Sequence, residues 1–435
     1  MNSNSVQGLL SFLEESLTAY HAVAAAAKRL EAGGFTRLEE GREWKLEAGR
    51  GYFTTRNGSS LIAFRIPRAD YRGFQMVMSH SDSPAFKLKE VAELPGEHYV
   101  QLDTERYGGP ILTTWMDRPL RIAGRALVRA GERIETRLVR LDGQLLIPNV
   151  AIHMNREINS GFAPNLQTDM LPLYGDGAAK GELARRLAES LGVEEAEILG
   201  SDLYLVNDAP GCVWGPHGEY YSCGRIDDLA CAYTALMAFE KGRSDSVSVY
   251  GLFDNEEIGS STKQGAHSTF LSDVLRRIHR GMGRGEEDFQ AALRNSFMVS
   301  ADNAHAVHPN HPEKCDPANR CYLNKGIVIK QAAGGSYATD GAAAAVFGEI
   351  CRLAGAPVQR FANRSDMPSG STMGCCIVSN LSVNTVDIGL PQLAMHSSYE
   401  TAGCTDIDFM IEGLAAFYST SIEAEADGAF VLHRS

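Results

Sequence analysis

The chain has 435 residues, which is long for one hydrophobic core and indicates two or three domains, or one domain with a large insertion. Apolar residues make up 44% and charged residues 22%, so disorder is excluded as the main state of the chain. The 41 basic and 54 acidic residues give a formal net charge of −13, which argues against a binder of nucleic acid or of an anionic membrane.

The N-terminus carries no recognisable targeting signal. Its first five residues include no basic residue, and the apolar run at residues 9–13 is followed at once by Glu14 and Glu15. A secretory signal peptide needs a basic start and about 7–15 apolar residues, and a membrane-spanning helix needs about 18 or more, so we expect a cytoplasmic protein. The nine cysteines include no Cys-x-x-Cys pair, which favours buried thiols over disulfides or a structural zinc site.

The first ninety residues predict the start of an α/β domain. The Ala-rich segment 21–30 predicts a helix that stops at Gly33 and Gly34. Segments 61–66 and 74–78 predict strands, and the second is so apolar that we expect both of its faces to be buried.

A change in the pattern of apolar residues along the sequence divides the chain into three parts. Between about residues 90 and 221, short alternating segments such as 121–128 are broken by Gly and Pro, which predicts a mostly β insertion. Longer segments with helical or buried-strand patterns then return, with helices expected at 229–239, 270–278 and 341–354 and strands at 247–253 and 297–300. We therefore predict a layered α/β catalytic domain formed by residues 1–90 and 222–435, interrupted by a β-rich domain at 91–221.

Clusters of reactive side chains lie mostly at or near the ends of the apolar strands, where α/β sheets usually bind ligands. His80 and Asp82 follow the strand at 74–78, and a metal-bound histidine commonly donates its second ring N–H to a carboxylate. Glu256 and Glu257 follow the strand at 247–253, where one can bind a metal and the other can reach water. The alternatives are a turn aspartate beside a loop histidine, and a solvated acidic turn.

Three further clusters complete the set. Asp227 and Asp228 open the helix at 229–239, where an aspartate is most often an N-cap. Asp302 follows the strand at 297–300; for the nearby His305 and His308 we favour an ordinary hydrogen-bonded pair over metal ligation. His396 stands alone in an apolar setting, which is typical of a satisfied core histidine.

Together these residues form a ligand set that none of them suggests alone. Two histidines and three or four carboxylates suit paired Zn²⁺, with Mn²⁺ or Co²⁺ also possible. A two-metal hydrolase needs terminal ligands for each ion, a bridging carboxylate and a free carboxylate as general base. The spacing does not choose between Asp227 and Asp228 for the bridge.

The chain resembles the aspartyl aminopeptidase family of dinuclear zinc metallopeptidases over nearly its whole length. The resemblance rests on an ordered series of short motifs: Tyr-His-Ala-Val at 20–23, Ser-His-Ser-Asp-Ser-Pro at 79–84, Ala-Ile-His-Met-Asn-Arg at 151–156, Arg-Ile-Asp-Asp at 225–228, Asp-Asn-Glu-Glu-Ile-Gly-Ser at 254–260, Ser-Ala-Asp at 300–302 through Pro-Asn at 309–310, Tyr-Ala-Thr-Asp at 337–340, Gly-Ser-Thr-Met-Gly at 370–374 and Met-His-Ser at 395–397.

The resemblance implies a fold and an activity. It implies a catalytic domain with helices on both faces of a mixed sheet, two zinc ions per subunit, and a cytosolic enzyme that removes N-terminal residues from peptides. It also implies a homo-oligomer, a tetrahedral dodecamer built from dimers and assembled through the inserted domain.

The resemblance further implies roles for single residues. One zinc would be held by His80, Asp227 and Asp302, and the other by Asp227, Glu257 and His396. The remaining assignments are Glu256 as general base, Asp82 as the residue that orients His80, His153 as a group that reaches a neighbouring subunit's site, and Lys330, Tyr337, Ser371 and Met395 as substrate-binding residues.

The sequence departs from the family pattern near the substrate. Ser336 stands where the family commonly carries Arg, and Cys375 and Cys376 follow Gly374 where the family tends to show Pro. Lys330 remains as a candidate partner for an acidic side chain, and a solvated loop lysine is its alternative. The preference for an acidic over a neutral N-terminal residue therefore stays open.

Rival functions remain. A dinuclear zinc carboxypeptidase or deacylase would need a basic group for the substrate carboxylate, for which Lys330 or Arg364 is available. A catalytically silent assembly scaffold would be expected to lack ligands, and none of the six metal and base residues is missing. A phosphate or nucleotide binder is set aside, because the chain has no Gly-x-x-x-x-Gly-Lys motif.

Overall fold

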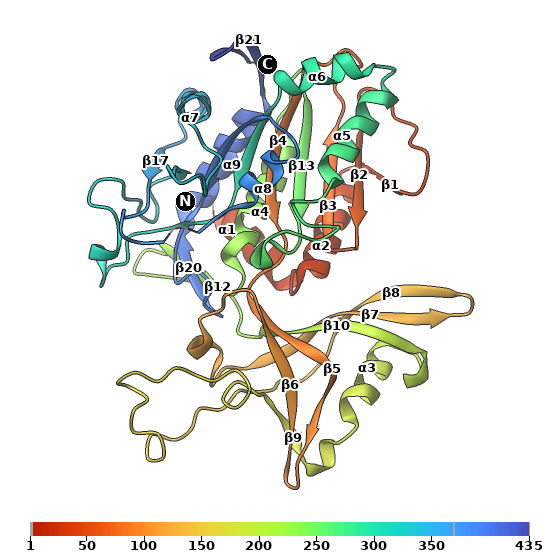
Figure 1. Ribbon diagram of the computed structural model, residues 1–435, viewed down its shortest axis with the longest axis vertical. Coiled ribbons are helices and arrows are strands. Elements are labelled where there is room, and N and C mark those ends of the chain that lie inside the picture. The colour runs from red at the N-terminus through yellow and green to blue at the C-terminus, as the bar shows by residue number, and fades with distance from the viewer. Residues whose placement is uncertain (1–2, 369, 435) are drawn as a thin grey trace.

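The computed structural model describes residues 3–368 and 370–434 and places helices and strands in alternation along much of the chain (Figure 1). The helices are α1 (Ser3–Glu15), α2 (Ala19–Ala32), α3 (Glu182–Leu191), α4 (Ile226–Lys241), α5 (Phe270–Gly281), α6 (Glu286–Arg294), α7 (Gly341–Ala354), α8 (Met373–Val378) and α9 (Cys404–Tyr418).

A nine-stranded mixed sheet forms the centre of the α/β part. Its spatial order is β1 (Thr36–Leu38), β2 (Gly51–Arg56), β3 (Ser60–Arg65), β13 (Val247–Phe253), β4 (Phe74–His80), β14 (Phe297–Ala301), β18 (Asn384–Gly389), β16 (Ile327–Lys330) and β17 (Val358–Phe361). The central strands β13, β4, β14 and β18 run parallel, whereas β3 and β16 run antiparallel to them. The predicted mixed α/β fold is confirmed.

Helices cover both faces of this sheet, which explains why its central strands β13, β4 and β14 are buried along their whole length. Successive residues of a strand point to opposite faces. Val77 of β4 accordingly packs into the core shared with α1, α2, α4, α7 and α9, whereas Met76 and Met78 pack into the core shared with α5, α6 and α8.

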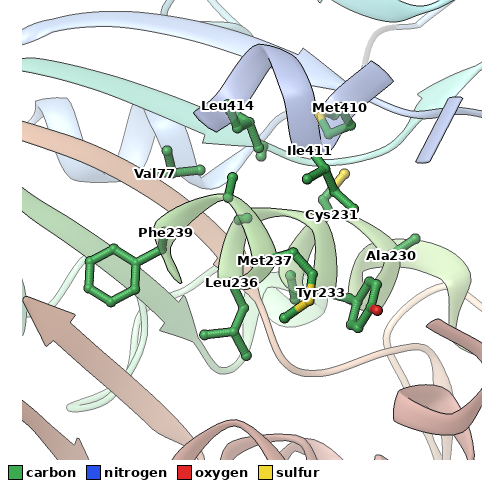
Figure 2. Close-up of a cluster of buried hydrophobic side chains, with 14 of the residues drawn as sticks. Val77, Ala230, Cys231, Tyr233, Leu236, Met237, Phe239, Met410, Ile411 and Leu414 are labelled. Atoms are coloured by element: carbon green, nitrogen blue, oxygen red, sulfur yellow. The ribbon is translucent and has the colours of Figure 1, made fainter. Parts of the chain in front are cut away.

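Helix α4 lies in the middle of the first core. Its Leu236 and Phe239 are fully buried, and α9 supplies Met410, Ile411 and Leu414 to the same cluster (Figure 2). Burial of one such side chain contributes roughly 1.5–3 kcal/mol. This packing anchors the helix whose first turn contains Asp227 and Asp228.

A second sheet lies apart from the first, in the lower half of Figure 1. Its order is β8 (Arg133–Arg140), β7 (Leu120–Ala130), β10 (Ile198–Asn207), β5 (Ala85–Pro95), β6 (Tyr99–Tyr107) and β9 (Leu173–Asp176). Helix α3 packs on it through Leu183 and Leu187. The sheet is antiparallel, and the predicted domain boundaries at residues 90 and 222 stay a prediction.

Two smaller sheets were not predicted. One has the order β11 (Cys212–Trp214), β12 (Tyr220–Cys223), β20 (Glu400–Gly403), β19 (Pro391–Leu393) and β15 (Ala304–His305), and the other is the hairpin of β21 (Thr420–Ala426) and β22 (Ala429–Arg434). Within residues 3–368 and 370–434, no helix combines the length and the apolar character needed to cross a membrane.

Candidate metal centre

Three neighbouring parallel strands deliver the first group of functional side chains. His80 is the last residue of β4, Asp302 directly follows β14, and Glu256 and Glu257 lie in the 3-10 turn η4 (Glu256–Ile258) just after β13. Because β13, β4 and β14 are adjacent and parallel, their carboxyl ends meet at one edge of the sheet.

Asp227, Asp228 and His396 reach the same place from outside the large sheet. The two aspartates form the first turn of α4 in non-helical backbone and are joined by a cis peptide bond. Neither carboxylate accepts a backbone N–H of α4 in the described part of the chain: Oδ1 of both has no hydrogen-bond partner, and Oδ2 of Asp228 accepts the backbone N–H of His80. The alternative interpretation of these aspartates as an N-cap is therefore wrong. His396 lies between β19 and β20, where its backbone has a left-handed φ of 69°.

The ligand atoms gather into three overlapping sets. Within each set they lie no more than 4.8 Å apart: His80 with Asp227, Asp228 and Asp302; His80 with Glu256 and Glu257; and Asp227 with Glu257 and His396. The two oxygens of Asp227 face different histidines, with Oδ1 3.7 Å from Nε2 of His80 and Oδ2 3.4 Å from Nε2 of His396. One carboxylate therefore lies between two candidate positions.

The chemistry of these side chains fits divalent cations. Oδ1 of Asp227, Oδ1 of Asp228 and Oε1 of Glu257 are buried without a hydrogen-bond partner among the described residues. Asp227 is 3% exposed and Asp228 is fully buried, and unpaired buried carboxylates are costly unless a cation neutralises them. Imidazole nitrogens together with carboxylate oxygens suit Zn²⁺, and also Mn²⁺ or Co²⁺.

The electrostatics of the cluster show an excess of negative charge. Burial, together with neighbouring carboxylates, raises the pKa of Glu256 to about 8 and that of Asp302 to about 6. Burial lowers the pKa of His396, but its hydrogen bond with Asp227 and the charge of Glu257 raise it to about 10 overall. A positive charge placed among these groups would therefore be strongly attracted.

Both histidines are held through their other ring nitrogen. Nδ1 of His80 lies 3.0 Å from the carbonyl oxygen of Asp82 and 3.4 Å from its carboxylate, so the main-chain contact is the closer one. Nδ1 of His396 lies 3.1 Å from the carbonyl oxygen of Gly109. When Nδ1 carries a proton and donates it to a carbonyl oxygen, Nε2 remains free to bind a metal.

The carboxylate of Asp82 contacts the paired glutamates. Its Oδ1 accepts the backbone N–H of Glu256 and its Oδ2 accepts that of Glu257, both at 3.2 Å. Asp82 thus touches His80 through its carbonyl and the glutamate turn through its side chain.

Two carboxylates join the site beyond those assigned from the sequence. Asp228 belongs to the set around His80, and its Oδ2 accepts the backbone N–H of His80 at 3.1 Å. Glu400 is buried and accepts the backbone N–H groups of Asp227 and His396 at 3.1 and 2.8 Å. Asp228 was visible as the neighbour of Asp227, but Glu400 lies in the short strand β20, where no motif pointed to it.

Lys330 lies inside the protein at the end of β16, so the alternative reading as a solvated loop lysine is wrong. Its Nζ donates to the carbonyl oxygens of Asp302 and Asn303 at 2.8 and 3.2 Å and lies 3.7 Å from the Asp302 carboxylate. Its ammonium is also 5.2 Å from the ring centre of Tyr337. The substrate-binding role of Lys330 and Tyr337 stays a prediction.

The other predicted residues lie outside the three sets. His153 lies on an exposed stretch between β8 and β9, Ser371 is exposed just before α8, and Met395 precedes His396 in a half-buried loop. Their roles stay predictions. The ring of His305 lies edge-on to that of Phe361, and the ring of His308 lies tilted against that of His311. The two histidines, which were expected to be a hydrogen-bonded pair, therefore have separate ring partners.

Comparison with known proteins gives one consistent family. The chain matches the family described as aminopeptidase I zinc metalloprotease (M18) over residues 12–418. Its relatives include a "Probable M18 family aminopeptidase 2" from Clostridium acetobutylicum, 44% identical over 94% of this chain and 98% of the relative. The protein of the same description from Stutzerimonas stutzeri is 40% identical over 95% and 98%.

Solved structures agree in fold. The chain is similar to one in the "Cryo-EM structure of the Ape4 and Nbr1 complex", with a TM-score of 0.91 and 35% identity over 95% of this chain and 85% of the other. It is also similar to a chain of the S. cerevisiae mApe1 dodecamer, with a TM-score of 0.82 and 28% identity over 96% of each chain.

Proposed function

The chain belongs to the aminopeptidase I zinc metalloprotease (M18) family, and from that premise we propose that it releases N-terminal residues from peptides with two zinc ions that share Asp227. The observation that carries the proposal is the position of Asp227, whose two carboxylate oxygens face His80 and His396 separately. In this proposal His80, Asp227 and Asp302 hold one ion, and Asp227, Glu257 and His396 hold the other.

Two bound zinc ions would supply Lewis acidity and lower the pKa of water at the site. Glu256 has the role of proton carrier: its carboxylate takes a proton from the attacking water and delivers it to the leaving amine. Burial and neighbouring carboxylates raise the pKa of Glu256 in the metal-free protein. Bound cations would lower this pKa again, so that the carboxylate can accept the proton. Asp82 keeps this glutamate in place by accepting its backbone N–H.

The oligomeric state is a further part of the proposal. The related mApe1 is described as a dodecamer, and in this chain His153 is flanked by the exposed apolar residues Ile152 and Met154. Such an exposed apolar stretch is typical of an interface. We propose a cytoplasmic homo-oligomer, a dodecamer of dimers, in which His153 reaches the site of a neighbouring copy.

A substrate panel tests the activity. We expect zinc-loaded protein to cleave aminoacyl p-nitroanilides with a free α-amine, and we expect N-acetylation of the same substrates to reduce kcat/KM to background, because the proposed enzyme requires the free amine. Matched Asp, Glu and Leu substrates test the acidic preference within the same panel. Cleavage that persists after N-acetylation would instead indicate a deacylase or carboxypeptidase.

A further inference from the structure

A short segment from the second sheet contacts the candidate metal centre at three consecutive residues. Strand β6 ends at Tyr107, and Gly108 and Gly109 follow it. Because β6 belongs to the sheet of the lower half of Figure 1, this segment connects the β-rich part to the site formed by the large sheet.

The hydroxyl of Tyr107 lies between Asp82 and Asn255, the two residues that contact or precede the Glu256–Glu257 pair. Its hydroxyl donates to Oδ2 of Asp82 at 2.7 Å and accepts from Nδ2 of Asn255 at 2.9 Å. Asp82 accepts the backbone N–H groups of Glu256 and Glu257, and Asn255 directly precedes them. The Tyr107 hydroxyl is therefore bonded both to Asp82, which accepts the N–H groups of the glutamate turn, and to Asn255, at which the turn begins.

Asn255 is constrained from its other side as well. Its backbone has a left-handed φ of 64°, a conformation that asparagine adopts more readily than other non-glycine residues. Its Oδ1 accepts from Oγ1 of Thr262 and from Nε2 of Gln264, both at 2.8 Å. These bonds leave its Nδ2 for Tyr107 and fix the direction in which the turn begins.

Gly108 and Gly109 lie against two of the proposed metal ligands, Glu257 and His396. Gly108 has a φ of +70°, and a Cβ at this position would lie 3.1 Å from Cβ of Glu257 and 3.2 Å from its Oε2. Only glycine combines this backbone conformation with so close an approach. The carbonyl oxygen of Gly109 contacts Nδ1 of His396 at 3.1 Å.

We propose that the segment Tyr107-Gly108-Gly109 is a positioning element of the site, in which the Tyr107 hydroxyl orients the Glu256–Glu257 turn for the reaction. Tyr107 acts through Asp82 and Asn255 and not on the substrate. This inference rests on the proposed aminopeptidase function, and it assigns to the second sheet a part in forming the catalytic geometry within one chain.

The test is Tyr107→Phe, which removes the hydroxyl and keeps the ring. We expect kcat to fall about 10–100-fold, the range for loss of a hydrogen-bond partner that supports a metal ligand, while KM and zinc content stay as in the wild type. We also expect faster hydrogen–deuterium exchange at the backbone amides of Glu256 and Glu257, measured on the metal-free protein.

Tyr204→Phe is the matched control. The Tyr204 ring lies edge-on to that of Tyr107, with 5.6 Å between centroids, and its hydroxyl makes no hydrogen bond with Asp82 in the described part of the chain. We expect wild-type kcat and exchange in this variant. Equal behaviour of the two variants in kcat and in exchange would overturn the inference.

Gly108→Ala is a second, independent variant. Its Cβ would displace Glu257, so we expect both zinc content and kcat to fall; wild-type values for both would contradict the inference. Failure of the proposed function is distinguishable, because wild-type protein would then cleave no substrate of the panel, whereas amide exchange would still report whether Tyr107 holds the turn.

Discussion

Replacement of Glu256 by glutamine is expected to lower kcat by about 10²–10⁴-fold, the usual contribution of a general acid–base group, and to leave the zinc content unchanged. Glutamine keeps the size and one oxygen of the side chain but cannot accept a proton. The two sets that share Asp227 do not include Glu256, although it lies near His80 and Glu257 in a third. Steady-state kinetics on zinc-loaded protein and metal analysis of the same sample measure both parts.

Glu257→Gln provides the matched comparison for that experiment. Glu257 neighbours Glu256 in the same turn but lies with Asp227 and His396, with Oε1 3.6 Å from Nε2 of His396. We expect its substitution to reduce the zinc content as well as kcat. Loss of zinc from the Glu256 variant, or full activity in it, would contradict its role as proton carrier.

Asp227→Asn is expected to abolish detectable turnover and to reduce zinc binding at both positions. Asp227 is the only residue of the described chain that lies with His80 and Asp302 in one set and with Glu257 and His396 in another. Replacement of one carboxylate oxygen by an NH₂ group removes a ligand and places a donor beside a cation. Zinc stoichiometry and kinetics of the variant are the measurements.

A conservative change elsewhere separates this effect from general damage. Asp340 caps helix α7, where its Oδ1 accepts the backbone N–H of Ala343 at 2.7 Å, and asparagine caps a helix about as well as aspartate. Asp340→Asn should therefore keep two zinc ions and wild-type kinetics. An Asp227→Asn protein that binds two zinc ions with normal turnover would refute the shared ligand.

The strands and helices that the sequence predicted best are those with one dominant signal. Strand β13 and helix α7 have the predicted bounds, 247–253 and 341–354. Strand β13 is a short run of buried residues, and the helix begins at an aspartate cap and ends before Gly355. Short strands such as β19 and β20 have no comparable pattern, because their pairing with the distant strands β15 and β12 helps to define them.

The residues of the site also divide into those that the sequence could predict and those that it could not. Residues at strand ends, such as His80 and Asp302, could be predicted because parallel strands bring their carboxyl ends together. The separate contacts of the two Asp227 oxygens and the hydrogen bonds of Glu400 depend on the three-dimensional path of the chain between distant segments. The contacts of the Lys330 ammonium with the carbonyl groups of Asp302 and Asn303 likewise depend on the packing of β16 and could not be predicted, and its substrate-binding role stays a prediction.

The most direct test of the shared-ligand centre is anomalous X-ray diffraction at the zinc absorption edge from crystals of zinc-loaded wild-type protein. We predict two peaks per chain, one bound by His80, Asp227 and Asp302 and the other by Asp227, Glu257 and His396, with the Asp227 carboxylate between them. A single peak, or peaks that are not in contact with Asp227, would contradict the two-ion site.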